Sequence, residues 1–241
     1  MGIIQTENLC FDYRKHSVLE NVNINIPEGA IYGYLGKNGA GKSTTIKLLL
    51  GLLTPAKGKV LYKGMDLSTN RLKILGFTGN LIEAPSFYPN LTGYENLKYM
   101  DMFLRHGDKR IAETLALTGL TDAADRRAKH YSTGMKQRLG IAMAMLNRPE
   151  ILILDEPVNG LDPEGIHEVR ELILRLQSEG KTIFLSSHLL SEIEKICTHI
   201  GILNNKSIVF EGTKDDLMAR TSTDTPDLES VFLSIIKNNV K

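Results

Sequence analysis

The chain has 241 residues, with 29 Lys or Arg and 28 Asp or Glu, so its formal net charge is +1. This length suits one large domain or two small ones, and the balanced charge gives no reason to expect nucleic acid as a partner. No uninterrupted apolar segment approaches the roughly 18 residues that span a bilayer, so we expect no direct membrane insertion. The two cysteines, Cys10 and Cys197, match no metal or redox spacing and are expected to be reduced thiols of a cytosolic protein.

The N-terminal part of the chain alternates apolar and polar residues as a β-sheet does. Residues 3–9 and 18–26 have this alternation, which predicts half-buried strands. Residues 30–35 form a short, mostly apolar run that is typical of a strand buried on both faces. A helix is predicted over residues 42–53, because its pattern ends near Thr54-Pro55.

The rest of the chain alternates strands with helices. Buried strands are predicted over residues 150–155 and 182–187, and residues 165–177 between them have helical spacing. The order strand–helix–strand predicts a parallel α/β sheet. Clear strands are missing from residues 92–147, so we expect an inserted α-helical subdomain at about 85–147. Residues 221–227 indicate a polar linker and 228–236 a short amphipathic helix, which divides the chain into a main domain (1–220) and a C-terminal linker and helix (221–241).

Residues 36–44 match the phosphate-loop pattern G-x-x-x-x-G-K-[ST]. Its glycines let successive backbone N–H groups point at a polyphosphate, and the following helix adds the positive end of its dipole. Lys42 is expected to reach the β- and γ-phosphates of ATP, and Ser43 to bind Mg²⁺ through its hydroxyl. The residues expected to contact the nucleotide here are Gly36, Asn38, Gly39, Ala40, Gly41, Lys42, Ser43 and Thr44.

The predicted strand 150–155 ends in a carboxylate that another carboxylate follows, Asp155-Glu156. Such a strand holds its terminal acid rigidly, so Asp155 suits a contact to Mg²⁺. Glu156 is then placed to act as general base on a water that attacks the γ-phosphate. An apolar run followed by two acids is common by itself, and its position after the next motif is what makes it informative.

Residues 131–138, Tyr-Ser-Thr-Gly-Met-Lys-Gln-Arg, resemble the signature of the ATP-binding cassette (ABC) ATPases. The resemblance covers nearly the whole chain, and it implies a RecA-like P-loop NTPase core with an antiparallel β edge and the inserted helical subdomain. It also implies that Ser132 and Gly134 contact ATP held by a partner subunit, while Ser132 can equally cap the helix that follows. Thr133 and Met135 replace the family's usual glycine and glutamine.

Three further positions match the family in order. Tyr13 occupies the place of an aromatic residue that stacks on adenine, although a tyrosine near a strand is often only packing. Asp162 lies in a loop that resembles the one through which each of two such subunits contacts the nucleotide site of the other. His188, directly after the strand 182–187, matches the switch histidine that would contact the γ-phosphate; by itself, a histidine at the end of a strand is more often structural.

The family normally has a glutamine where this chain has Glu83, ahead of the segment Pro89-Asn90-Leu91-Thr92. A carboxylate there can still coordinate Mg²⁺ or water. Together with the signature string, Glu83 resembles the ATPases of lantibiotic self-protection and bacitracin-resistance exporters. The alternative is a tolerated exchange without bearing on cargo.

The resemblance implies an ATP hydrolase that works as a homodimer around two ATP molecules and drives separate transmembrane permease subunits. Its expected location is cytoplasmic, peripheral on the inner face of the membrane, and its expected cargo is a peptide antibiotic or similar amphiphile. The competing hypothesis is a soluble ABC ATPase that acts on ribosomes or nucleic acid. Such proteins usually carry two cassettes or long insertions, which this chain lacks. A regulatory module that binds ATP without hydrolysing it fits less well, because Glu156 and His188 are both present.

Overall fold

The computed structural model describes residues 2–14, 16–220 and 227–238, and the chain divides into two compact units. The first unit comprises residues 1–75 and 182–241, and the second comprises residues 76–181. The predicted linker lies, except for Asp227, outside the described residues. No helix in the described ranges is long and apolar enough to cross a membrane.

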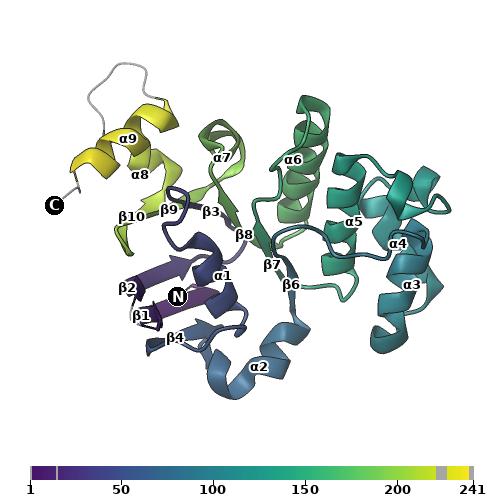
Figure 1. Ribbon diagram of the computed structural model, residues 1–241, viewed down its shortest axis with the longest axis horizontal. Coiled ribbons are helices and arrows are strands. Elements are labelled where there is room, and N and C mark those ends of the chain that lie inside the picture. The colour runs from purple at the N-terminus through teal and green to yellow at the C-terminus, as the bar shows by residue number, and fades with distance from the viewer. Residues whose placement is uncertain (1, 15, 221–226, 239–241) are drawn as a thin grey trace. The chain divides into compact units, whose positions relative to one another are not determined.

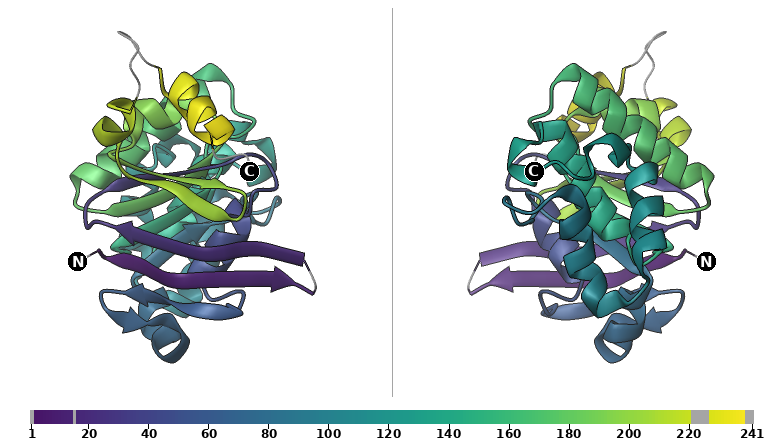
Figure 2. Two further views of the ribbon diagram at one scale, coloured as in Figure 1. Left: turned by 90° about the vertical axis from the view of Figure 1, so that its left-hand side faces the viewer. Right: turned by 90° about the vertical axis from the view of Figure 1, so that its right-hand side faces the viewer.

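The first unit contains two sheets (Figure 1). Its strands are β1 (Ile4–Tyr13), β2 (His16–Ile26), β3 (Ile31–Leu35), β4 (Lys57–Tyr62), β5 (Met65–Asp66), β8 (Thr182–Ser187), β9 (His199–Asn204) and β10 (Ser207–Thr213). One sheet is antiparallel in the order β2-β1-β4-β5, and its long pair β1–β2 is the purple ribbon of Figure 2. The other has the order β10-β9-β3-β8, in which β3 runs parallel to both β8 and β9.

The helices of the first unit lie between its strands and at the C-terminal end of the described chain. They are α1 (Lys42–Leu49), α7 (Leu190–Ile196), α8 (Lys214–Met218) and α9 (Leu228–Asn238), and α2 (Leu67–Gly76) begins in this unit. The predicted helix over residues 42–53 is therefore four residues too long. Gly51 has a φ of 64°, and a residue in this left-handed conformation ends a helix. The core of this unit includes Tyr32 and Phe184 on neighbouring strands, whose rings stack with centroids 5.7 Å apart.

The second unit combines two parallel strands with a group of helices. Its elements are β6 (Thr78–Leu81), α3 (Gly93–Leu104), α4 (Asp108–Leu117), η1 (Thr121–Ala123), η2 (Ala128–His130), α5 (Thr133–Met145), β7 (Ile151–Asp155) and α6 (Pro163–Ser178). The helical character predicted for residues 92–147 is present as α3 to α5, which enclose a core of Leu97, Ile111, Leu115, Leu139 and neighbouring apolar residues. With its parallel strands, antiparallel edge and helical segment, the chain is an α/β protein with the fold predicted from the sequence.

Candidate functional site

The phosphate loop lies in the first unit, between the end of β3 and the start of α1. Gly39 and Gly41 have φ values of 79° and 113°, a conformation that glycine adopts without steric cost. A Cβ on Gly41 would also lie 2.9 Å from a methyl carbon of Leu19. The N–H of Ala40 closes the turn by donating to the carbonyl of Lys37 at 3.1 Å. The motif thus forms the strand–loop–helix turn that phosphate binding needs.

Lys42 is buried and folds back along the loop. Its Nζ donates to the carbonyl oxygens of Gly36 at 2.9 Å and Lys37 at 3.5 Å. Ser43 is exposed and Thr44 half-buried on the first turn of α1. An ammonium group and a hydroxyl therefore stand at a helix N-terminus, where backbone N–H groups and the helix dipole favour an anion.

One buried residue beside the loop was missed by the sequence analysis. The hydroxyl of Thr45, which is fully buried, donates to the carbonyl of Gly41 at 3.0 Å and lies 3.1 Å from the hydroxyl of Tyr34. These bonds tie the last glycine of the loop to α1 and to β3. The phosphate-loop motif ends at Thr44, so no sequence signal marks Thr45.

His188 lies next to the phosphate loop. The strands β3 and β8 are parallel, with Leu35 opposite Ser187, so the segments that follow them emerge at the same edge of the sheet. A cavity of about 190 Å³ is found there, lined by Gly36, Lys37, Asn38, Ser187, His188, Leu190 and Phe232. The topology of the first unit thus brings His188 and the loop residues to one hollow.

Tyr13 ends β1 and is 46% exposed. Its ring meets that of Phe11 edge-on, with centroids 4.8 Å apart. This contact fixes the ring from one side, while almost half of the side chain remains accessible to a stacking partner.

In the second unit, three carboxylates lie at or just after the ends of two neighbouring parallel strands. β6 and β7 are parallel and pair with Leu81 opposite Leu154. Glu83 and the pair Asp155-Glu156 therefore lie at the same edge of the sheet, where the two strands end. Asp155 is 3% exposed, whereas Glu83 is exposed. Because a strand end and buried surroundings fix Asp155, its carboxylate has a defined direction.

Glu83 and Glu156 have an uncommon backbone conformation. Their φ values are 59° and 50°, in the left-handed region that residues with a Cβ seldom adopt and that is often found at functional sites. The carbonyl of Glu156 accepts a hydrogen bond from the N–H of Asn159 at 3.1 Å. A sharp turn therefore follows β7 and sets the direction of the Glu156 side chain.

The signature residues form the N-terminus of α5, beside that of α6. The hydroxyl of Ser132 accepts from the N–H of Met135 at 3.1 Å, and the carboxylate of Asp162 accepts from the N–H of Gly165 at 3.0 Å. Each residue is thus a helix N-cap. The capping role predicted for Ser132 is confirmed, and the cap at Asp162 is why α6 begins two residues earlier than predicted. A Cβ on Gly134 would lie 3.4 Å from the Cα of Gly165, so the first turns of the two helices touch through glycines.

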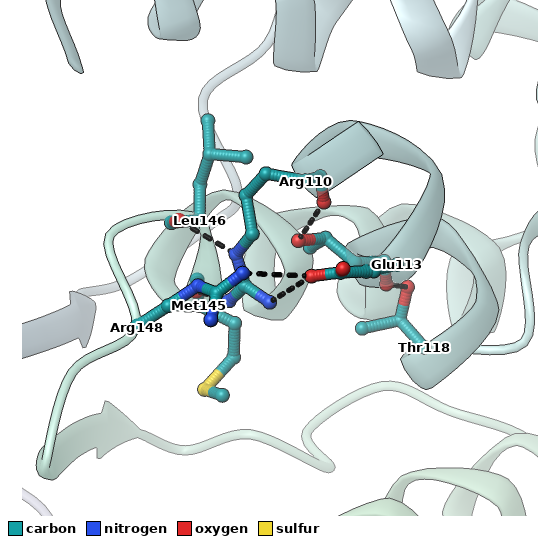
Figure 3. Close-up of polar contacts among 7 residues, drawn as sticks. Arg110, Glu113, Thr118, Met145, Leu146 and Arg148 are labelled. Carbon is teal, nitrogen blue, oxygen red and sulfur yellow. Dashed lines mark hydrogen bonds and ion pairs between the residues drawn. The ribbon is translucent and has the colours of Figure 1, made fainter. Parts of the chain in front are cut away.

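Arg110 on α4 holds the other end of α5 and was also missed by the sequence analysis (Figure 3). It donates through Nε to the carbonyl of Leu146 at 2.9 Å and through a second nitrogen to that of Met145, and it pairs with Glu113 at 3.6 Å. Glu113 also pairs with Arg148 at 3.0 Å. Burial lowers the pKa of Arg110, but a guanidinium remains charged in proteins. The last carbonyls of a helix lack partners within it, and Arg110 supplies them from a neighbouring helix.

Arg138, the last residue of the signature string, ties the middle of α5 to two other elements. It donates to the carbonyls of Thr118 at 3.2 Å and Gly119 at 2.8 Å, just after α4. It also pairs with Glu168 of α6 at 3.2 Å. The signature helix is therefore held at its start, its middle and its end by polar contacts within the second unit.

The predicted site residues fall into two groups, one in each unit. The first unit holds Tyr13, the phosphate loop and His188, and the second holds Glu83, Ser132, Gly134, Asp155, Glu156 and Asp162. Among the described residues, no group of three or more His, Cys, Asp or Glu side chains is arranged to hold a metal ion by itself. Mg²⁺ is typically bound by one or two protein oxygens together with substrate phosphates rather than by a group of three such side chains.

Comparison with known proteins identifies the family. The family model described as "ABC transporter" matches residues 19–159. The chain is 43% identical to the Lantibiotic transport ATP-binding protein SrtF of Streptococcus pyogenes, covering 88% of this chain and 92% of that one. It is 46% identical to the Bacitracin transport ATP-binding protein BcrA of Bacillus licheniformis, covering 90% of this chain and 72% of that one.

A solved structure described as the ATP binding subunit of an ABC transporter has the same fold. It superimposes with a TM-score of 0.85 at 30% identity, covering 97% of this chain and 99% of that chain. Sequence family, fold and phosphate loop agree, and the chain therefore belongs to the ABC transporter family, as an ATP-binding subunit that hydrolyses ATP.

Proposed function

We propose that two copies of this chain enclose two ATP molecules, each between the phosphate loop of one copy and the residues Ser132 and Gly134 of the other. The observation that carries the proposal is the cavity shared by the phosphate loop and His188. A histidine at this point reaches the end of a polyphosphate whose other phosphates lie on the loop. The capped N-terminus of α5 supports the second half of the proposal, because Ser132 and the free backbone N–H groups of a first helical turn suit an anion.

Hydrolysis then depends on positioning and on charge stabilisation. Lys42 offsets the negative charge of the β- and γ-phosphates, and His188 donates a hydrogen bond to the γ-phosphate. Glu156 takes a proton from the attacking water. Ser43 and Asp155 would hold Mg²⁺, for which Glu83 is a further candidate, and the ion would neutralise charge that develops on the phosphate oxygens. Asp162 would carry contact with the partner's site, and Tyr13 would stack on adenine.

ABC subunits of this kind work with separate membrane subunits, and the second unit carries an exposed apolar patch that suits such a partner. Tyr88, Tyr99 and Phe103 form a row of ring contacts, with centroids 4.8 Å and 6.2 Å apart, and Phe103 is 78% exposed. Exposed patches of large apolar residues commonly mark interaction surfaces. The patch begins five residues after Glu83, so a membrane subunit bound to it would contact a segment that also carries a proposed Mg²⁺ ligand. The subunit would then be peripheral on the cytoplasmic face of the membrane.

The proposed cargo is a peptide antibiotic or a similar amphiphile. Two observations support it: the two relatives are a lantibiotic transport and a bacitracin transport ATP-binding protein, and this chain has Glu83 in place of glutamine. The alternative of a soluble ABC ATPase on ribosomes or nucleic acid has less support, because the relatives are transport proteins and the net charge is only +1.

Glu156→Gln tests the proposed function. We expect the purified variant to lose ATPase activity and to elute as a dimer in gel filtration with ATP and Mg²⁺, since it binds both nucleotides without hydrolysing them. Glu179→Gln, an exposed carboxylate at the end of α6, is the matched control and should behave as the unchanged protein. Retained turnover would remove Glu156 from the role of base, and lost turnover without an ATP-dependent dimer would contradict the shared-site arrangement.

The export proposal has a separate test in cells. The chain is co-expressed with candidate membrane subunits taken from the genes that neighbour its own, and survival is measured in a lantibiotic and in bacitracin. Protection that disappears with Glu156→Gln supports ATP-driven export of such peptides. Survival that is equal with and without the pair would contradict this cargo.

A further inference from the structure

We propose that Phe232, on the C-terminal helix α9, is a positioning residue that holds His188 over the phosphate loop. This inference rests on the proposed role of His188 in hydrolysis. Phe232 lies at the far end of the chain from the phosphate loop in sequence, yet both line the cavity that contains His188. The side chain is 8% exposed, so nearly all of its surface is in contact with the protein.

The apolar face of α9 is packed against the rest of the first unit. Leu228, Val231, Phe232 and Ile236 are all buried, at helical spacing, whereas Leu233 is 42% exposed. The helix contacts α7 and α8, beside which it lies in Figure 1. Asp227 accepts a hydrogen bond from the N–H of Ser230 at 2.7 Å and so satisfies one of the first N–H groups of the helix.

The segment that carries His188 depends on this packing. α7 begins at Leu190, two residues after His188, and has only seven residues. Helices of this length do not form without tertiary contacts. Its N-cap, Leu189, supplies no side-chain hydrogen bond, although the Leu189 N–H donates to the hydroxyl of Ser187 at 3.0 Å. α7 is therefore positioned by packing, with β3 and α9 among the elements that it contacts.

Phe232 is the member of α9 that reaches the cavity itself. Leu190, the first residue of α7, lines the same cavity, so Phe232 and Leu190 form its apolar wall beside His188. Removal of the aromatic ring would enlarge the cavity and release the start of α7, which carries the backbone of His188 with it. Misplacement of a catalytic group by about 1 Å can reduce a rate on the order of 100-fold.

The inference is tested by steady-state ATPase measurements on the full chain with MgATP. We expect Phe232→Ala to lower kcat roughly 10- to 100-fold and to change the KM for ATP less than about twofold, because the contacts of the phosphate loop remain. Phe232→Leu, which refills most of the cavity, should recover most of the lost rate. Leu233→Ala, one position along the same helix but on its exposed side, is the control and should leave kcat unchanged.

A double-mutant cycle separates positioning from general destabilisation. If Phe232 acts through His188, then Phe232→Ala has no further effect in a His188→Ala background, since groups that act as a unit are non-additive. An equal fold-loss in both backgrounds, or an unchanged kcat in Phe232→Ala, would overturn the inference. Should Phe232→Ala not fold, Phe232→Val carries the same cycle with an expected loss of roughly threefold or more.

The two proposals fail in different ways. If His188→Ala keeps its full kcat, the proposed role of His188 is wrong. If His188→Ala lowers kcat and Phe232→Ala keeps its full kcat, the proposed role of His188 stands and only the positioning role of Phe232 is wrong.

Discussion

Replacement of Gly134 by alanine should leave the fold intact while it impairs hydrolysis. Gly134 lies in the first turn of α5, and the nearest atom to a Cβ built there is the Cα of Gly165 at 3.4 Å, an ordinary van der Waals contact. The fold therefore has room for the methyl group. Because alanine is favoured over glycine in a helix by up to about 1 kcal/mol, we expect an unchanged or slightly higher free energy of unfolding.

The effect on catalysis should have the opposite sign. If Gly134 faces a nucleotide bound to a second copy, an added methyl group in that closed contact costs about 1–3 kcal/mol. This corresponds to a rate loss of roughly 5- to 150-fold. Urea unfolding gives the stability, and the ATPase rate with the size of the ATP-bound species gives the function. Gly140→Ala is the contrasting variant. Its Cβ would lie 2.8 Å from a carbon of Pro85, and this steric overlap should lower the free energy of unfolding of the monomer.

Two results would refute the reasoning. Full activity in Gly134→Ala would mean that Gly134 does not face the nucleotide in the closed dimer. A loss of activity that parallels a loss of unfolding free energy would mean that the α5–α6 contact has no room for a methyl group.

Three further predictions concern stability and reactivity. Arg110→Met should lower the free energy of unfolding in urea by about 2–4 kcal/mol, because it removes charged hydrogen bonds to the end of α5. Arg148→Met, at an exposed position, should change that free energy by less than about 0.5 kcal/mol. Equal losses in the two variants would contradict the capping role of Arg110. Burial acts to raise the pKa of Asp101, but backbone N–H groups donating at 2.9 Å and 2.8 Å outweigh it, so its pKa lies below the ordinary 3.8. The Asp101 carboxyl loses its proton more readily in the folded state than in the unfolded chain, so this stabilisation is present above pH 3.8 and disappears as the pH falls through the lower folded pKa. Asp101→Asn should therefore have a lower free energy of unfolding in urea than the unchanged protein at pH 7, and a similar one at pH 3. A difference that does not depend on pH would contradict this assignment. Burial raises the pKa of the Cys197 thiol well above its usual range, whereas Cys10 is partly exposed. A thiol reagent should therefore modify one cysteine in the native protein and two in denaturant. Fast modification of both cysteines in the native protein would show that Cys197 is accessible.

The sequence by itself determined the family, the fold class and the identity of the chemical groups. Phosphate loops and apolar strands that end in carboxylates are local patterns, because the glycines, the lysine and the strand residues follow each other directly. The buried strands were found for the same reason: β8 was predicted at its observed bounds, and β3 and β7 began one residue later than expected. Helix ends were less accurate, since they depend on single residues such as Gly51 and Asp162.

Tertiary structure alone decided which distant residues share a site. Nothing in the local sequence connects Phe232 with the phosphate loop, yet the parallel register of β3 and β8 and the packing of α9 bring Phe232 and His188 to one cavity. Similarly, Arg110 supports the signature helix through hydrogen bonds to carbonyl groups, and a carbonyl acceptor leaves no mark on residue type. Contacts of this kind depend on backbone geometry and on long-range packing, so only the folded chain reveals them.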